Sequence, residues 1–260
     1  MIAIQEGKRK FLLNYKTVNY ARIAYFMKIS EYFHQVNAQV QTIFQSSSTQ
    51  IKELGAYHDA TATIHELSEL IGHQNEPQLL KIVCAQLEAS NLCMLYGMYR
   101  SAFSALRLSL EFGVAACYFS VNKLEEKEWL DGRSDLIWGV ITSTENGAIS
   151  KRMAKAYFPE LEEFIPEFQT KTSKVYRQLS EYVHGNVDTW TTTGLIIEKS
   201  QALEEEYDRA FSDTICAILF SLSLRYLREL GRDTWPESPI FIDTFREITP
   251  IREFLENTTK

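Results

Sequence analysis

The sequence predicts an all-α protein, a helical bundle, and three observations lead to this fold class. Glycine and proline are scarce, at 11 and 6 of 260 residues, so long stretches of the chain contain no helix breaker. In residues 12–46, 78–121 and 201–230 the apolar side chains recur every three or four positions, which is helical spacing. Hydrophobic residues make up 45% and charged residues 23%, so there is ample material for a core. We expect helix in more than half of the residues.

The first half of the chain is expected to hold long helices. One covers about 12–46, and the polar run 46–49 ends it and offers an N-cap for a more polar helix over about 49–72. Pro77 suits the first turn of the next helix, which opens the most apolar region of the chain, 78–121. The second half of that region is expected to be the central helix of the core.

Residues 122–150 differ from the rest. Asp131-Gly132 and Asn146-Gly147 are turn signals, and the β-branched residues 140–142 lie between them. We therefore expect a small irregular or hairpin insertion that covers one end of the core. Strand is expected only in short pieces near 138–142 and 190–198.

Two further helices follow the insertion. The first covers about 167–184 and is stopped by Gly185, and the second covers about 201–230 and is stopped by Gly231. We divide the chain into three parts: an N-terminal helical region (1–75), a bundle that contains the insertion (76–235), and a C-terminal tail packed on the bundle (236–260).

The charge balance narrows the function classes. The formal net charge is −7 and the pI about 5.4, which argues against a dedicated binder of duplex DNA but leaves room for a local basic groove. No run of 18 uninterrupted apolar residues occurs, and the N-terminus lacks the apolar core of a signal peptide. We expect a cytoplasmic protein without a membrane segment.

No metal or cofactor is expected. Motifs for nucleotide-binding loops, dinucleotide folds, serine hydrolases and zinc proteases are absent from the sequence. His58 and His65 lie beside acidic residues on one predicted helix and could bind a metal, but a solvated helix face is the competing interpretation. None of the four cysteines has CxxC spacing, so we expect buried free thiols in a reducing compartment: Cys84, Cys93, Cys117 and Cys216.

One short segment carries the candidate chemistry. Arg177 and His184 are seven residues apart, close to two helical turns, so they share a face with a rise of roughly 10 Å between them. An arginine can hold a phosphate, and a histidine can move a proton near neutral pH. Lys171 and Lys174 continue a positive ribbon from Arg177. The competing interpretation is a helix-capping histidine beside solvated lysines.

A second pair of charges lies in the most apolar region. Arg107 and Glu111 are four residues apart on the expected central helix, where an unbonded charge would be costly. They form either a structural ion pair or part of the lining of a site.

These residues resemble the HEPN superfamily, helical-bundle proteins of prokaryotic defence and toxin–antitoxin systems. The superfamily signature is an arginine, four to six residues, and a histidine, which Arg177 and His184 match within Tyr-x-x-Leu-x-x-x-x-His-Gly. The segment 105–111 is similar to the arginine-and-glutamate core helix of several HEPN-like families, and the resemblance covers about residues 80–230.

The resemblance implies a metal-independent endoribonuclease that works as a homodimer on RNA. It implies that His184 transfers the proton and Arg177 holds the phosphate. Tyr182 and Asn186 would then position the substrate together with Lys171 and Lys174, while Arg107 and Glu111 support the site from the central helix.

A non-catalytic module is the alternative function. Active relatives often carry Asn, Asp or His directly after the arginine, where this chain has Gln178. In this alternative the HEPN-like module binds a protein partner, such as an antitoxin or an effector, and regulates it. Whether Arg177 and His184 converge in an open cleft is the structural observation that separates the two functions.

Overall fold

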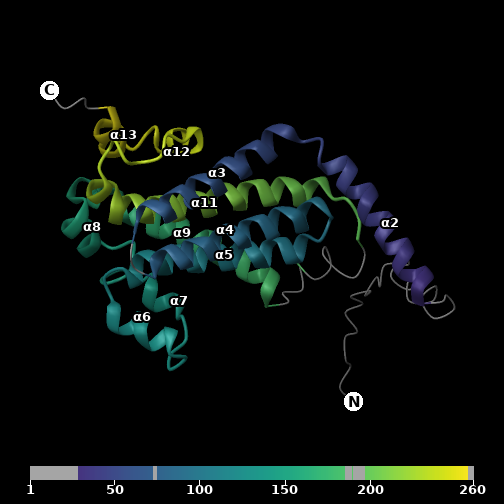
Figure 1. Cartoon of the computed structure of the whole chain (residues 1–260), viewed down its shortest axis with the longest axis horizontal. Helices are drawn as coiled ribbons and strands as arrows, with labels where there is room; N and C mark the ends of the chain where they lie inside the picture. The colour runs from purple at the N-terminus through teal and green to yellow at the C-terminus, as the bar shows by residue number, and fades with distance from the viewer. Residues whose placement is uncertain (1–28, 73–74, 185–188, 190–196, 257–260) are drawn as a thin grey trace, which may run out of the picture.

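The computed structural model describes residues 29–72, 75–184, 189 and 197–256. The described residues form helices and contain no strand, which confirms the all-α prediction (Figure 1). Five long helices lie side by side and build the bundle: α3 (Ile51–Leu70), α4 (Glu76–Leu95), α5 (Tyr99–Phe119), α9 (Ile165–Val183) and α11 (Gln201–Leu230).

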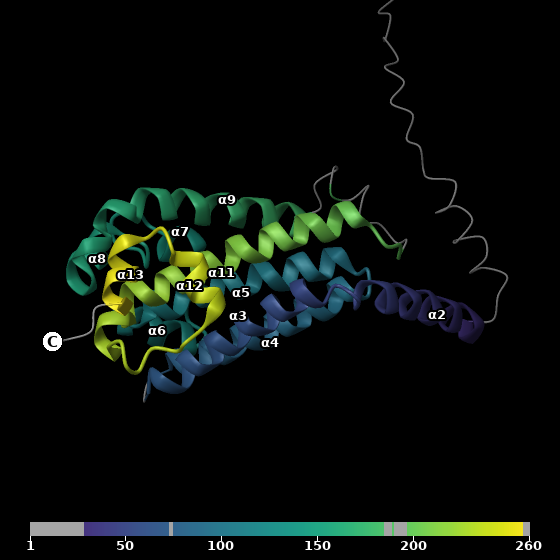
Figure 2. The ribbon, with the colours of Figure 1, turned by 90° about the horizontal axis from the view of Figure 1, so that it is seen from above.

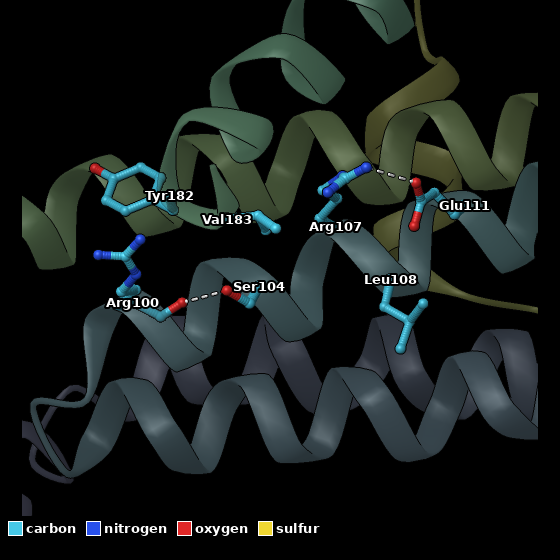
Figure 3. A pocket seen from close by; sticks show the side chains of 7 residues that line it. All are labelled: Arg100, Ser104, Arg107, Leu108, Glu111, Tyr182 and Val183. Atoms are coloured by element: carbon cyan, nitrogen blue, oxygen red, sulfur yellow. Dashed lines mark hydrogen bonds and ion pairs between the residues drawn. The ribbon is translucent and has the colours of Figure 1, made fainter. Parts of the chain in front are cut away.

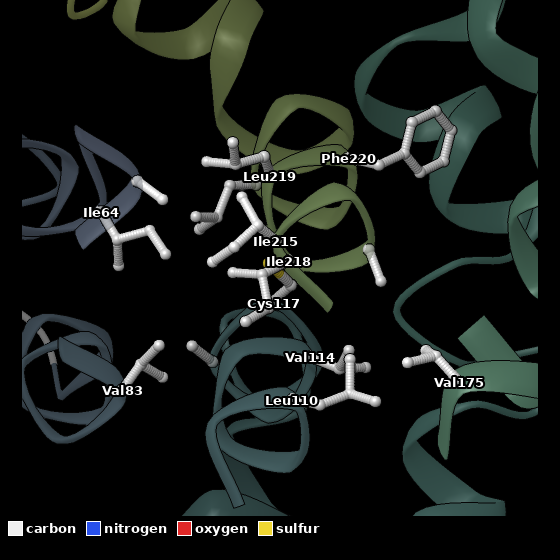
Figure 4. Close-up of a cluster of buried hydrophobic side chains, with 14 of the residues drawn as sticks. Ile64, Val83, Leu110, Val114, Cys117, Val175, Ile215, Ile218, Leu219 and Phe220 are labelled. Atoms are coloured by element: carbon white, nitrogen blue, oxygen red, sulfur yellow. The ribbon is translucent and has the colours of Figure 1, made fainter. Parts of the chain in front are cut away.

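Helix α5 lies at the centre of the bundle, as expected for the most apolar region. It packs against α4 on one side and against α9 and α11 on the others. Its inward side chains are fully buried and meet those of α4, α9 and α11 in one continuous core (Figure 4). Phe168 of α9 and Phe220 of α11 stack with ring centroids 3.5 Å apart, which fixes α9 on the bundle.

A close helix crossing depends on one glycine. A Cβ atom at Gly113 of α5 would lie 2.6 Å from Cγ1 of Ile218 on α11, nearer than two carbon atoms can approach. The absence of a side chain at this position therefore allows α5 and α11 to pack as closely as they do.

The insertion at 122–150 is helical and irregular, and the strand predicted at 138–142 is wrong. The insertion holds α6 (Lys123–Leu130) and α7 (Trp138–Ile141). The backbone N–H groups of residues 140–142 donate to the carbonyls of Ile137 and Trp138, so local turn bonds replace any strand pairing. Packing of α7 on α5 then overrides the β preference of these residues. Of the second predicted strand, residues 190–196 lie outside the described residues, and 197–198 have no regular structure.

The remaining helices lie around the bundle. After the insertion, α8 (Lys151–Tyr157) and the 3-10 helix η1 (Pro159–Phe164) lead into α9. Helices α12 (Pro239–Phe245) and α13 (Thr249–Glu256) follow α11, and α12 packs on α3.

Helix α2 (Ile29–Ser47) extends away from the bundle (Figure 2). Ser47 at its C-terminal end donates a 2.7 Å hydrogen bond to the buried carboxylate of Glu204 on α11. Residues 12–28 of the helix predicted over 12–46 lie outside the described residues.

Two helices are long and apolar enough to cross a membrane by length and composition alone. They are α5 and α11, whose most apolar windows are 67% and 78% buried within the bundle. Both form the centre of the core, so packing already accounts for their apolar composition.

Candidate functional site

A shallow pocket of about 300 Å³ lies between α5 and the C-terminal end of α9 (Figure 3). Two arginines and a glutamate from α5 meet a tyrosine and a valine from α9. The full lining is Arg100, Ser104, Arg107, Leu108, Glu111, Tyr182 and Val183. The structure thus brings together three of the predicted site residues: Arg107, Glu111 and Tyr182.

Arg107 is held in place by several contacts. Its guanidinium donates to the carboxylate of Glu111 at 3.0 Å and to the phenol oxygen of Tyr176 at 2.7 Å. The guanidinium carbon also lies 4.8 Å from the centre of the Tyr176 ring. The Nε atom of Arg107 is buried and has no hydrogen-bond partner among the described residues. The ion pair expected from the sequence is therefore present, with one donor left over.

Aromatic stacking extends this wall of the pocket into the insertion. The rings of Tyr176 and Trp138 lie 4.0 Å apart and nearly parallel, at 6°. Trp138 belongs to α7, so the insertion contacts α9 through the residue that binds Arg107. The orientation of Arg107 consequently depends on α5, α7 and α9 together.

Tyr182 is a buried wall of the pocket. Its ring stacks on Phe103 of α5, with centroids 3.9 Å apart and planes at 17°. Burial raises the pKa of Tyr182 strongly, and the nearby carboxylates of Glu206 and Glu181 raise it further. The phenol is therefore neutral at physiological pH and keeps its proton for hydrogen bonding. Gln178, one turn earlier on α9, donates to Glu206 at 3.1 Å.

Arg177 and His184 lie on the exposed side of α9. The helix buries Val175, Leu179 and Tyr182, and Arg177 projects from the opposite side. His184 is the C-cap residue, and its backbone N–H donates to the Ser180 carbonyl at 3.0 Å. Among the described residues, neither side chain forms an ion pair or a hydrogen bond. Both are available to a ligand, but the described part of the chain does not enclose them in a cleft.

The predicted lysine ribbon turns away from this side of the helix. Each step of three residues along a helix displaces the side chain by about 60° around the helix axis. Lys171 is two such steps from Arg177 and therefore lies about 120° around α9 from it. Lys171 is paired with Glu167 at 2.6 Å, and this hydrogen bond raises the pKa of its ammonium group. Lys174 is exposed. Asn186, the last predicted substrate contact, lies outside the described residues.

The sequence interpretation missed Arg100. It lines the pocket, and Figure 3 shows its guanidinium pointing from α5 toward Tyr182. A signal was present, because Arg100 and Arg107 have the same seven-residue spacing as Arg177 and His184. Only the packing of α9 against α5 distinguishes such a pair from two solvated side chains.

The metal site considered at His58 and His65 has no further ligand nearby among the described residues. No group of three or more histidine, cysteine or acidic side chains is close enough there to share an ion. His58 and His65 are exposed on α3. Asp59 accepts a hydrogen bond from the backbone N–H of Ile240, 2.9 Å away, and so helps to hold α12.

No known family model, characterised protein or solved structure matches this chain. The fold and the site together define an all-α bundle with an arginine-lined pocket between α5 and α9 and an exposed arginine and histidine on the outer side of α9.

Proposed function

We propose that this protein is a metal-independent endoribonuclease of a prokaryotic defence or toxin system, with His184 and Arg177 in its active site. One observation carries the proposal: both side chains are exposed on the same side of α9, without a partner among the described residues. An arginine with no structural bond and a histidine at a helix end are free to contact a phosphate. The lining of the arginine-lined pocket on α9 ends at Val183, the residue before His184 in the chain.

The chemistry follows from the two residue types. His184 accepts the proton of a ribose 2′-hydroxyl, whose oxygen attacks the adjacent phosphorus. The bond from phosphorus to the 5′-oxygen breaks, leaving a 2′,3′-cyclic phosphate and a 5′-hydroxyl end. Arg177 stabilises the charge that builds up on the phosphate oxygens.

The leaving 5′-oxygen needs a proton donor, and a second copy of the chain would supply it. The other described histidines, His34, His58 and His65, lie on α2 and α3 rather than beside the pocket. A homodimer with two α9 helices facing each other would bring a second His184 to the reacting phosphate. It would also convert an exposed helix face into a cleft.

The regulatory module remains the second candidate, and a specific observation favours it. Arg177 and His184 project from a polar face of α9 that the described residues leave uncovered. Such a face suits binding of a protein partner, such as an antitoxin or an effector, as well as it suits RNA.

Incubation of the purified protein with total RNA in EDTA tests the proposal. The wild type should produce fragments with cyclic phosphate ends, and His184→Ala should lose about 10²–10⁴ in rate with its melting temperature nearly unchanged. Arg177→Ala should behave similarly. Lys174→Ala, an exposed change on the same helix, should have a smaller and salt-dependent effect. Full activity in folded His184→Ala would rule out this mechanism.

A further inference from the structure

We infer that Arg100 and Arg107 form a phosphate-binding subsite for single-stranded RNA in the pocket between α5 and α9. The inference rests on the proposed function, because it concerns the RNA that Arg177 and His184 would cleave. It adds a residue, Arg100, that the Arg177–His184 pair does not require.

The charges in the pocket leave a net positive group. Arg107 and Glu111 neutralise one another at 3.0 Å. Arg100 forms no ion pair with any described carboxylate, although Glu181 of α9 and Glu206 of α11 lie near Tyr182, outside the pocket lining. The residues that line the pocket therefore carry a formal charge of +1, which comes from Arg100, whose side chain can bind an anion through two parallel hydrogen bonds.

The second arginine contributes a fixed donor. The Nε atom of Arg107 is buried without an acceptor among the described residues, which is a costly state for a charged group. The Arg107 side chain is 15% exposed and lines the pocket, so a phosphate would meet the accessible edge of its guanidinium rather than Nε. Glu111 and Tyr176 already hold the guanidinium in place, so binding would require little reordering of this residue.

The shape of the pocket favours a flexible strand. Its volume of about 300 Å³ is at the lower end for ligand pockets and suits one phosphate with part of its sugar. The phosphates of a rigid A-form duplex lie on its outer surface and could reach only the rim. A single strand can lower one phosphate between the helices.

The acidic surface makes this subsite measurable. With a net charge of −7, the rest of the protein offers little general attraction for RNA, so one arginine should account for a large share of binding. Binding can be separated from cleavage with an RNA that carries 2′-O-methyl groups, because its 2′-oxygens cannot attack.

The test is fluorescence anisotropy with a short, labelled, 2′-O-methylated single-stranded RNA across a salt series. Arg100→Ala should weaken binding about 10-fold and reduce the salt slope by about 0.7, as expected for one lost phosphate contact. Arg100→Lys should keep the slope but lose part of the affinity, because it keeps the charge without the planar fork. Arg246→Ala is the matched control, since Arg246 is exposed and paired with Asp243 at the C-terminal end of α12, and it should bind like the wild type.

Several outcomes would overturn the subsite. An unchanged Kd and slope in Arg100→Ala would do so, and Arg100→Gln repeats the measurement should the alanine variant unfold. Equal binding of a duplex of the same length would overturn the preference for single strands. If Arg100→Ala weakened binding of 3′-UMP but not of RNA, the pocket would serve a free nucleotide instead.

Failure of the subsite and failure of the catalytic proposal give different results. Cleavage that needs His184 but is indifferent to Arg100 would remove only the subsite. RNA binding that needs Arg100, in a protein whose cleavage is unaffected by His184→Ala, would remove only the proposed mechanism.

Discussion

The guanidinium of Arg107 on α5 donates a hydrogen bond to the phenol oxygen of Tyr176 on α9, 2.7 Å away. The two residues are 69 positions apart in the chain, and this contact joins the central helix to the helix that carries Arg177 and His184. Trp138 stacks on the same tyrosine, so the insertion is tied to the same point. This wall of the pocket therefore depends on Arg107, which Glu111 holds from within α5 and Tyr176 holds from α9.

Tyr176→Phe should lower the free energy of unfolding by about 1–2 kcal/mol, because it removes a hydrogen bond to a charged group and keeps the ring. Tyr157→Phe is the matched control. Arg225 also lies over the ring of Tyr157, at 4.3 Å, but no hydrogen bond of its hydroxyl is seen among the described residues. Urea denaturation measures both variants, and equal losses would contradict the importance of the Arg107–Tyr176 bond.

Gly113→Ala should destabilise the bundle by about 1–3 kcal/mol, because the new methyl group would overlap Ile218 at the α5–α11 crossing. In an Ile218→Ala background, where the overlapping side chain is absent, Gly113→Ala should cost less stability than it does in the wild type. Gly55→Ala provides the comparison, since its Cβ would meet nothing within 4 Å in the interior of α3. It should raise stability by about 0.5–1 kcal/mol through helix propensity. Thermal and urea unfolding that gave both glycine variants the same sign would contradict this account.

Asp208→Asn should stabilise the protein at neutral pH. Burial raises the pKa of the Asp208 carboxyl above its ordinary value of 3.8, and the nearby Glu53 raises it further. As pH rises from 3.8 through the raised pKa, the folded state still holds a proton that the unfolded chain has released, so stability falls across this window. Asparagine does not titrate, so this loss of stability with rising pH should disappear. Its amide oxygen can still accept the hydrogen bond that the Tyr57 hydroxyl donates to Asp208.

Chemical denaturation at several pH values from 4 to 7 measures this effect. The advantage of Asp208→Asn over the wild type should grow with pH across the lower part of that range. Asp213→Asn, an exposed change on the same helix, should show no comparable trend. A stability difference that was constant with pH would exclude titration of Asp208 as its cause.

The protein should be a dimer with His184 near the interface. Light scattering should give a mass twice the 30.0 kDa of one chain at micromolar concentration. A disulfide should form between copies of His184→Cys on mild oxidation but not between copies of His58→Cys, on the exposed side of α3. Background reaction should be slow, because burial raises the pKa of Cys93 and raises that of Cys216 to about 11. A monomer would count strongly against a composite active site.

The helices could be placed from the sequence because helix formation depends on spacing within a short window. The final long helix covers 201–230 as predicted, and α9 differs from its predicted range by about two residues at the start. The pair Arg107–Glu111 was also predictable, because residues four apart on a helix are neighbours wherever the helix lies. Local rules failed at 138–142, where packing of α7 on α5 and α9 turned β-branched residues into a helical turn.

The site itself was decided by tertiary structure. The sequence by itself placed Arg177 and His184 on one side of a helix, because their spacing is close to two helical turns. It could not pair Arg107 with Tyr176 or bring Arg100 to face Tyr182, since these contacts join segments about 70 to 80 residues apart and depend on how α9 packs across α5. Spacing along one helix specifies which residues share a side, whereas packing between helices determines which side becomes a pocket.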